Sequence, residues 1–231
     1  MEYLLIWDID GTLVHTQGAG GKAMDRAFLK LHGIEEGFRD IDMAGGLDPV
    51  ILRDALAQYM LSNENNSEFF SLYCKYLSYE LEKLASSIII PGIAALFDVL
   101  GTMQGFYNVL GTGNIEKGAR IKLSLNNLNR FFPTGGFADG ETERWQVIKK
   151  AVDNSCSLFN KTFDSTNTYV IGDTPKDIAC GKKLNLKTIG VATGRHTAED
   201  LQKCNPDHVF ENLTDIDAFL NILNPVTETG K

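Results

Sequence analysis

The stretch Tyr3–Leu13, YLLIWDIDGTL, decides the fold class of this chain. It opens with a nearly continuous apolar run, which predicts a strand over residues 3–9 that is buried on both faces of a parallel sheet. Asp8 and Asp10 begin on the same face of this strand, and Gly11 permits a tight turn beneath them. Buried carboxylates at the mouth of a sheet repel each other, and a divalent cation commonly relieves that cost. The two acids are therefore candidate metal ligands, with caps for the following turn as the alternative.

Four more apolar stretches have the same texture and predict further parallel strands. They span residues 106–110, 168–171, 188–191 and 208–210. The first three of the five predicted strands run directly into polar or glycine clusters, at 8–12, 111–114 and 172–175. Ligands of open α/β sheets bind at the carboxyl ends of the strands, so the three clusters are expected to converge on one crevice. The chain is thus predicted to have an α/β fold with a parallel sheet.

The pattern of apolar residues changes between the first two predicted strands. Residues 15–89 show helical periodicity and no strong strand, which predicts an inserted all-helical domain. Residues 1–14 and 90–231 would then form the core. The glycine-rich stretch from Gly18 to Gly21 and the Pro91-Gly92 pair bracket the insert and are candidate hinges.

Apolar positions at helical spacing predict three helices in this insert. They occur over Met24–Leu31, Leu52–Tyr59 and Phe69–Leu84. Gly33 is expected to cap the first helix at its C-terminus, and Asp48 to cap the second, which Pro49 can open. The aromatic stripe of the third helix is interpreted as core packing rather than as a partner surface or a cofactor wall.

A second acidic pair, Asp173 and Asp177, follows the strand predicted at 168–171 and spans the start of a helix opened by Pro175. Residues four apart share one helical face, so the two carboxylates are expected to point toward the same side. By itself such a pair is more often an N-cap and a favourable charge near the positive helix end. Together with the two acids after the first strand, it offers the hard oxygen ligands that Mg²⁺ prefers.

Two further clusters suit a bound anion. Thr112, Gly113 and Asn114 follow the second predicted strand, where a hydroxyl and backbone N–H groups at a helix start can bind an anion, although a plain strand-to-helix turn is an equal alternative. Arg144 precedes a predicted helix and can reach the strand ends, where its guanidinium would bind phosphate in a bidentate manner. We prefer it to Lys149 and Lys150, which lie farther along the helix and are expected to be solvated.

The composition excludes several classes of protein. The 231 residues include 22 Lys and Arg against 30 Asp and Glu, a formal net charge of -8, so no basic field exists to hold nucleic acid. Four scattered cysteines fit a reducing compartment better than a disulfide framework or a zinc site. The first apolar run has no basic leader and is far shorter than the roughly 20 residues of a membrane span. We therefore expect a cytoplasmic protein without membrane or nucleic-acid partners, monomeric or weakly dimeric.

The polar clusters resemble the four motifs of the haloacid dehalogenase-like (HAD) superfamily, in the family's order. The matches are Asp8-Ile9-Asp10-Gly11-Thr12-Leu13, Thr112, Arg144, and Gly172-Asp173-Thr174-Pro175-Lys176-Asp177. The first motif is highly specific, the last is strong after a hydrophobic strand, and the other two gain meaning from this order. The resemblance covers essentially the whole chain. It implies a Rossmann-like core with a helical cap inserted after the first motif, as in phosphoglycolate phosphatases and β-phosphoglucomutases.

The resemblance also implies catalytic and metal-binding roles. Asp8 would be the nucleophile that forms an aspartyl phosphate, and Asp10 would protonate the leaving oxygen and later deprotonate water. Mg²⁺ would be held by the Asp8 carboxylate, the Asp10 main-chain carbonyl and Asp173. Asp177 would orient a metal-bound water or a neighbouring group from the second shell. The phosphorylated substrate would be bound by Ile9, Asp10, Thr112, Gly113, Asn114 and Arg144, of which Arg144 replaces the lysine usual in the third motif.

A Mg²⁺-dependent phosphatase acting on a small phosphorylated metabolite, similar to phosphoglycolate phosphatases, is the function that this resemblance favours. Asp10 argues against dehalogenation, because family members that cleave carbon–halogen bonds lack an acid there. A phosphosugar mutase with the same core remains an alternative, as does a non-catalytic phosphate-binding protein of this fold. A dinucleotide-dependent enzyme is disfavoured, since no Gly-x-Gly-x-x-Gly turn follows the first strand.

The predicted cap departs from familiar members in one loop. Gly45-Gly46-Leu47-Asp48 stands where phosphoglycolate-type enzymes often carry Gly-Arg-Thr-Asp. The missing basic residue removes an obvious partner for a substrate carboxylate. Other polar candidates near the insert are His15, Thr16, Gln17 and Lys22, each at least as well explained as plain surface.

Overall fold

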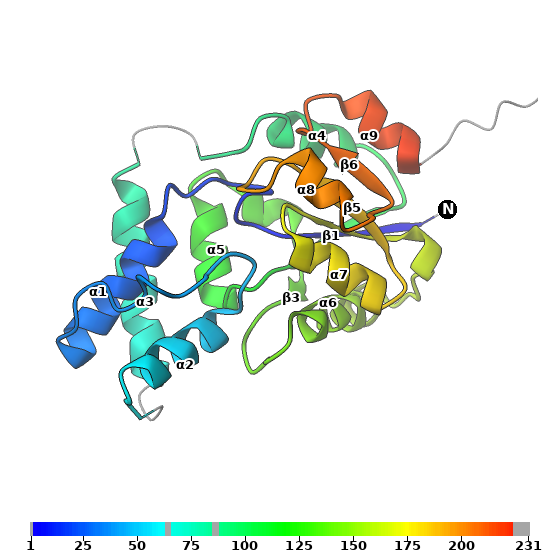
Figure 1. Cartoon of the computed structure of the whole chain (residues 1–231). Coiled ribbons are helices and arrows are strands. Elements are labelled where there is room, and N and C mark those ends of the chain that lie inside the picture. Colours follow the sequence, from blue (N-terminus) through cyan, green and yellow to red (C-terminus); the bar gives the residue numbers. More distant parts are fainter. Residues whose placement is uncertain (1, 63–65, 85–87, 224–231) are drawn as a thin grey trace, which may run out of the picture.

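The computed structural model describes residues 2–62, 66–84 and 88–223. Within them, six parallel strands form one sheet in the order β3-β2-β1-β4-β5-β6 (Figure 1). The strands are β1 (Tyr3–Trp7), β2 (Phe106–Gly111), β3 (Gly135–Gly136), β4 (Thr168–Gly172), β5 (Lys187–Val191) and β6 (His208–Phe210). The predicted α/β fold with a parallel sheet is confirmed. β3 was not predicted, because two glycines carry no side-chain pattern.

The first strand is shorter than the sequence predicts. β1 ends at Trp7 rather than at residue 9, because the Ile9 carbonyl accepts the N–H groups of Leu13 and Val14, at 2.9 and 3.1 Å, and so belongs to the turn. Gly11 takes a φ of 81° in this turn, a conformation that favours glycine. Asp8 follows the last residue of β1 and still donates its N–H to the Ile171 carbonyl of the neighbouring strand at 2.9 Å, whereas Asp10 lies in the turn.

Helices cover both faces of the sheet (Figure 1). The Trp7 ring packs against Phe97 and Phe219 on one face, with ring centroids 5.1 and 5.8 Å away, while Leu4 and Ile6 pack into a second cluster on the other. The first face carries α4 (Ile93–Leu100) and α9 (Ile216–Leu223), and the second carries α6 (Arg144–Phe159) and α7 (Pro175–Lys183). The remaining core helices are α5 (Glu116–Ser124), α8 (Ala198–Gln202) and the short 3₁₀ helices η1 (Leu128–Phe131) and η2 (Ser165–Asn167). Burial on both faces explains the continuous apolar run of β1.

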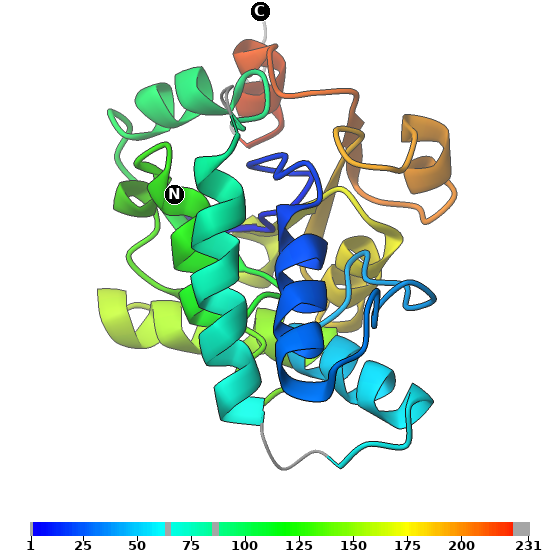
Figure 2. The ribbon, with the colours of Figure 1, turned by 90° about the vertical axis from the view of Figure 1, so that its left-hand side faces the viewer.

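The insert contributes α1 (Ala19–His32), α2 (Asp48–Gln58) and α3 (Asn66–Glu82) on one side of the sheet. α1 and α3 lie side by side (Figure 2), joined by the rings of Phe28, Phe38 and Phe69 at centroid separations of 5.3 to 6.5 Å. Phe69 and Tyr73 of the aromatic stripe are buried in this core, as predicted, although Tyr73 also lines the cavity described below. Gly33 ends α1 with a φ of 70°, and its N–H donates to the Leu29 carbonyl, which confirms the predicted cap.

The predicted N-cap role of Asp48 is wrong. The N-cap of α2 is Leu47, and no side chain caps the helix. The Asp48 carboxylate instead accepts the N–H of Ile115 at 2.9 Å, and its own N–H donates to the Gly113 carbonyl at 2.8 Å. These two hydrogen bonds attach the start of α2 to the loop after β2. The Asp48 carboxylate therefore connects the insert to the core. Pro49 lies in the first turn, as predicted.

The two chain segments that connect the insert to the core run antiparallel beside each other. Val14 forms a bridge with Ile89, the His15 N–H donates to the Ile88 carbonyl at 2.7 Å, and the Ile90 N–H donates to the Leu13 carbonyl at 3.0 Å. The predicted boundaries of the core, at residues 14 and 90, fall within these two paired segments. The division into two domains and the hinges at its ends stay predictions. No helix in the described part of the chain is long and apolar enough to cross a membrane.

Candidate active site

A cavity of about 500 Å³ opens at the carboxyl ends of the strands and is lined by both core and insert. The core supplies Asp8, Asp10, Gly113, Asn114, Arg144 and Asp173, and the insert supplies Met24, Met43, Ile51 and Tyr73. β1 pairs in register with β2 and β4, with Trp7 opposite both Leu110 and Ile171. This alignment brings together the three polar clusters that follow these strands.

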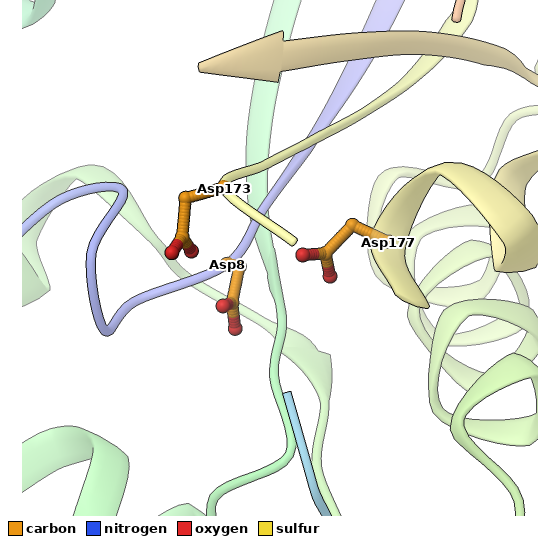
Figure 3. A group of neighbouring side chains, drawn as sticks. All are labelled: Asp8, Asp173 and Asp177. Atoms are coloured by element: carbon orange, nitrogen blue, oxygen red, sulfur yellow. The ribbon is translucent and has the colours of Figure 1, made fainter. Parts of the chain in front are cut away.

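Three buried carboxylates converge at this edge of the sheet. Oxygens of Asp8, Asp173 and Asp177 lie within 4.8 Å of one another (Figure 3). Burial raises the pKa of Asp8 to about 6, although Arg144 opposes the shift. Burial and the charges of Asp8 and Asp177 raise the pKa of Asp173 to about 8. Clustered buried acids with hard oxygen donors suit a divalent metal ion.

Close backbone approach restricts the Asp173 side chain further. A Cβ atom at Gly11 or at Gly194 would overlap the Asp173 carboxylate. The Thr12 hydroxyl donates to the same carboxylate at 3.2 Å. The two glycines and this hydroxyl therefore hold Asp173 beside Asp8.

Asp177 fulfils both readings that the sequence left open, since it closes the capping box of α7 and also lies in the acidic cluster. Its Oδ2 accepts the Thr174 N–H at 3.1 Å and the Thr174 hydroxyl at 2.6 Å. Its Oδ1 accepts Nε and Nη2 of Arg144 at 3.0 and 2.5 Å. With both oxygens engaged, Asp177 is a support for Arg144 more than a free ligand.

Arg144 begins α6, and its guanidinium reaches the strand ends. Nη2 lies 3.0 Å from Asp8 Oδ1, and the side chain is 7% exposed. By contrast, Lys149 pairs with Asp153 and Lys150 with Glu141, and both lysines are about half exposed, at 57% and 43%. The structure thus places Arg144, and neither lysine, beside the first acidic motif.

Only part of the polar cluster at residues 112–114, after β2, lines the cavity. Gly113 and Asn114 line it, whereas Thr112 and Ile9 are fully buried outside the lining. The Thr112 hydroxyl accepts the backbone N–H of Asn114 at 3.3 Å and its side-chain amide at 2.8 Å. A Cβ at Gly113 would overlap the Gly46 carbonyl, so only glycine fits where insert and core meet. The N–H groups of Asn114 and Ile115 already donate to protein oxygens. The predicted anion site therefore has fewer free backbone donors than the sequence suggests.

Lys122 of α5 is a site residue that the sequence reasoning missed. Its Nζ donates to Asp10 Oδ2 and to Asn114 Oδ1, both at 2.5 Å, and the side chain is 5% exposed. Although burial opposes it, the Lys122 ammonium and the hydrogen bonds of Lys122, Asn114 and Thr16 lower the pKa of Asp10. A signal was available, because Lys122 shares the small, buried helical face of Gly118 and Ala119.

The cavity contains other residues that were not predicted from the sequence. Gly194 and Arg195 line it from the loop after β5, and Arg195 pairs with Asp42 of the insert at 3.0 Å. Burial raises the pKa of Asp48, which faces the cavity, to about 7. Of the polar candidates near the insert, His15, Thr16 and Gln17 line the cavity, and Lys22 does not.

Known proteins share this fold over most of their length. A curated relative from Dickeya dadantii (strain 3937), named probable phosphatase IndB, is 23% identical over 94% of this chain and 92% of its own. A putative phosphatase structure from Clostridium difficile has a TM-score of 0.65 at 21% identity, covering 96% of this chain and 99% of that one. A putative β-phosphoglucomutase from Bacteroides vulgatus has a TM-score of 0.66 at 16% identity, covering 97% and 89%.

One family model matches part of the core. Residues 147–216, from α6 to the start of α9, match a family model described as HAD-hydrolase-like. This match, the parallel sheet and the nearly full-length similarity to a curated relative agree with the motifs at the strand ends. The chain thus has the fold of haloacid dehalogenase-like proteins, and its C-terminal core is similar to them in sequence.

Proposed function

We propose that this protein is a Mg²⁺-dependent phosphatase that cleaves a small phosphomonoester through an aspartyl phosphate on Asp8. The observation that carries the proposal is the position of the Asp8 carboxylate, buried at the end of β1 between the Arg144 guanidinium and the Asp173 carboxylate. The curated relative named a probable phosphatase supports the same reaction class. The substrate would enter the cavity that core and insert share.

Asp8 would act as the nucleophile. Its carboxylate oxygen would attack phosphorus while the bond from phosphorus to the ester oxygen breaks, leaving an acyl phosphate on Asp8. Water would then attack this phosphorus, releasing inorganic phosphate and restoring the carboxylate. Arg144, held in place by Asp177, would bind phosphoryl oxygens beside Asp8 and stabilise the charge of the transition state.

Asp10 would move the protons. It would give a proton to the leaving oxygen in the first step and take one from water in the second. Lys122, Asn114 and Thr16 hold the Asp10 carboxylate at the cavity wall. The lowered pKa of Asp10 in this arrangement corresponds to the base form, which is the form needed to activate water.

The carboxylates of Asp8 and Asp173, with the main-chain carbonyl of Asp10, would hold the metal ion. The fit rests on the buried cluster of hard oxygen donors and on the glycines that keep Asp173 close to Asp8. When bound, Mg²⁺ would neutralise charge so that an anionic nucleophile can approach an anionic phosphoryl group. Asp177, committed to Arg144 and Thr174, would stay behind the ligands.

Phosphate release from a panel of phosphomonoesters and a generic aryl phosphate tests this proposal. We expect release with Mg²⁺, none with a chelator, and a loss of at least about 1,000-fold in kcat for Asp8→Asn, because the nucleophile is removed. Circular dichroism serves as the check that the variant folds. Retained turnover in Asp8→Asn contradicts the nucleophile assignment. A wild-type enzyme that releases phosphate from no ester contradicts the phosphatase and favours a mutase or a binding protein.

A further inference from the structure

The wall of the cavity formed by α2 and α3 carries two polar side chains that the reaction at Asp8 does not use. Asp48 begins α2 and Tyr73 lies in α3, and both line the cavity. Both are almost fully buried, at 6% and 1% exposed. Two polar groups held out of bulk water on the insert side of the cavity need a partner there.

Asp48 has one carboxylate oxygen in use and one free. Oδ2 accepts the Ile115 N–H, whereas Oδ1 has no hydrogen-bond partner among the residues that the structure describes. No lysine or arginine of the described ranges forms an ion pair with this carboxylate. Asp48 therefore offers an acceptor, and a negative charge, to whatever occupies the cavity.

Tyr73 offers the complementary group. Its hydroxyl has no hydrogen-bond partner in the described part of the chain, although its ring packs against Phe70 at a centroid separation of 6.3 Å. The hydroxyl lies near Gly20 and near the Lys122 ammonium, because a Cβ at Gly20 would meet Tyr73 Oη at 4.0 Å and Lys122 Nζ at 3.6 Å. It can both donate and accept a hydrogen bond on the insert side of the cavity.

The cations of the cavity are already committed to carboxylates. Arg144 contacts Asp8 and Asp177, Lys122 contacts Asp10, and Arg195 contacts Asp42. These three are the Lys and Arg side chains that line the cavity within residues 2–62, 66–84 and 88–223. An anionic group on the leaving part of the substrate would meet the Asp48 charge without a free cation to balance it.

The rest of the insert wall suits a small organic group. Met24, Met43 and Ile51 supply apolar surface, and three glycines line the same wall: Gly20, Gly45 and Gly46. The volume of about 500 Å³ falls in the range of roughly 300–1,000 Å³ that is typical of small-molecule sites. A leaving group with carbon-bound hydrogens on one side and hydroxyls on the other matches these surfaces.

We infer that the substrate is a phosphomonoester of an uncharged, hydroxylated alcohol, a polyol or a sugar. Its hydroxyls would bond to the free oxygen of Asp48 and to the Tyr73 hydroxyl, and Asp48 would exclude leaving groups that carry a carboxylate. This inference rests on the proposed phosphatase activity and names the substrate class of that site. Asp48 and Tyr73 are thus specificity-determining residues that the insert brings to the reaction.

Two matched pairs of esters, assayed at about pH 8, above the pKa of Asp48, test the inference. Racemic glycerol 1-phosphate is compared with racemic 3-phosphoglycerate, and sorbitol 6-phosphate with 6-phosphogluconate, since the members of each pair differ only by a hydroxymethyl group in place of a carboxylate. In at least one pair, we expect kcat/KM to favour the uncharged ester by about tenfold or more, because a buried charge rejects an unpaired anion. An aryl phosphate is assayed in parallel.

Substitutions assign this preference to the two residues. Asp48→Asn keeps an acceptor for the Ile115 N–H but removes the charge, so we expect it to reduce the preference about tenfold. Tyr73→Phe is expected to lower kcat/KM for the preferred uncharged ester. Asp54→Asn on the exposed side of α2 and Tyr79→Phe on the exposed side of α3 are matched controls that leave the preference unchanged.

The outcomes separate this inference from the proposed function. If the aryl phosphate is hydrolysed but the carboxylate esters are the better substrates, or if none of the four esters reacts, the inferred substrate class is overturned. A preference that Asp48→Asn leaves intact overturns the role of Asp48. If the aryl phosphate and all four esters fail to react with Mg²⁺ present, the proposed function itself fails.

Discussion

At the scale of single residues, the site depends on how each charge is paired. Arg144 bridges Asp8 and Asp177, and Lys122 bridges Asp10 and Asn114, so that each acid of the first motif contacts its own cation. Buried charges are tolerated when they are paired and hydrogen-bonded in this way. The two acids consequently lie in different surroundings, with Asp8 in the acidic cluster and Asp10 on the cavity wall.

Substitution of Lys122 tests the control of Asp10. Lys122→Met removes the ammonium that lowers the pKa of Asp10, so the limb of the pH profile of kcat/KM that Asp10 governs moves to higher pH. We expect kcat to fall by about 10- to 100-fold, a part of what acid–base catalysis supplies. Steady-state kinetics with the aryl phosphate across pH measures both effects.

Lys117→Met is the matched control for this substitution, because Lys117 lies on the exposed side of the same helix. Its pH profile should coincide with that of the wild type. An unchanged profile in Lys122→Met would show that the contact with Asp10 has no role in proton transfer.

At the scale of elements, the segment between α1 and α2 is attached to the core at several points. Asp42 pairs with Arg195 at 3.0 Å, Lys176 donates to the Ala44 carbonyl at 2.7 Å, and Arg144 Nη1 donates to the Gly45 carbonyl at 3.3 Å. The Asp48 contact with Ile115 continues this series into α2. The segment therefore lies along one side of the cavity, attached to the loop after β5 and to the first turns of α6 and α7.

Asp42→Asn tests the contribution of the outermost contact. The pair with Arg195 is more than half exposed on both sides, so its loss should cost less than about 1 kcal/mol. We expect KM for the preferred ester to rise about two- to fivefold with little change in kcat. High salt should produce a similar rise in the wild type and a smaller one in the variant.

Asp54→Asn, which removes an exposed pair with Arg53 on α2, controls for the general effect of a lost surface charge. A KM in Asp42→Asn equal to that of the control would show that this ion pair does not hold the segment in place.

At the scale of the whole molecule, stability is linked to pH through three buried acids. The pKa values of Asp8, Asp48 and Asp173 are raised to about 6, 7 and 8, from values near 4 in an unfolded chain. The folded protein binds more protons than the unfolded chain between these limits. Stability of the metal-free protein should therefore fall as pH rises from about 4 to 8.

Thermal unfolding with and without Mg²⁺ measures this linkage. Metal binding requires ionised ligands, so Mg²⁺ should raise the melting temperature more at about pH 8 than at about pH 5, by at least about 2–4 °C. Asp173→Asn should remove most of this Mg²⁺ effect, because it takes away one proposed ligand. A Mg²⁺ effect that is equal at both pH values, or that survives in the variant, contradicts the metal site.

Features that depend on local pattern were predictable from the amino-acid sequence. The apolar runs gave five of the six strands in place, Gly33 marked the end of α1, and the first motif placed Asp8 and Asp10 at the mouth of the sheet. These features follow from side-chain periodicity and backbone preference, which act over a few residues. The same local rules predicted an N-cap at Asp48, which tertiary contacts overrode.

Which polar groups contact one another depends on tertiary packing. Lys122 reaches Asp10 across 112 positions of the chain, and Asp48 turns to Ile115 across 67. Local pattern reports which face of an element is buried, but a buried charge takes its partner from whichever element packs against it. The first motif was therefore readable from the sequence, while the cations around it and the insert wall of the cavity depended on how the helices pack on the sheet.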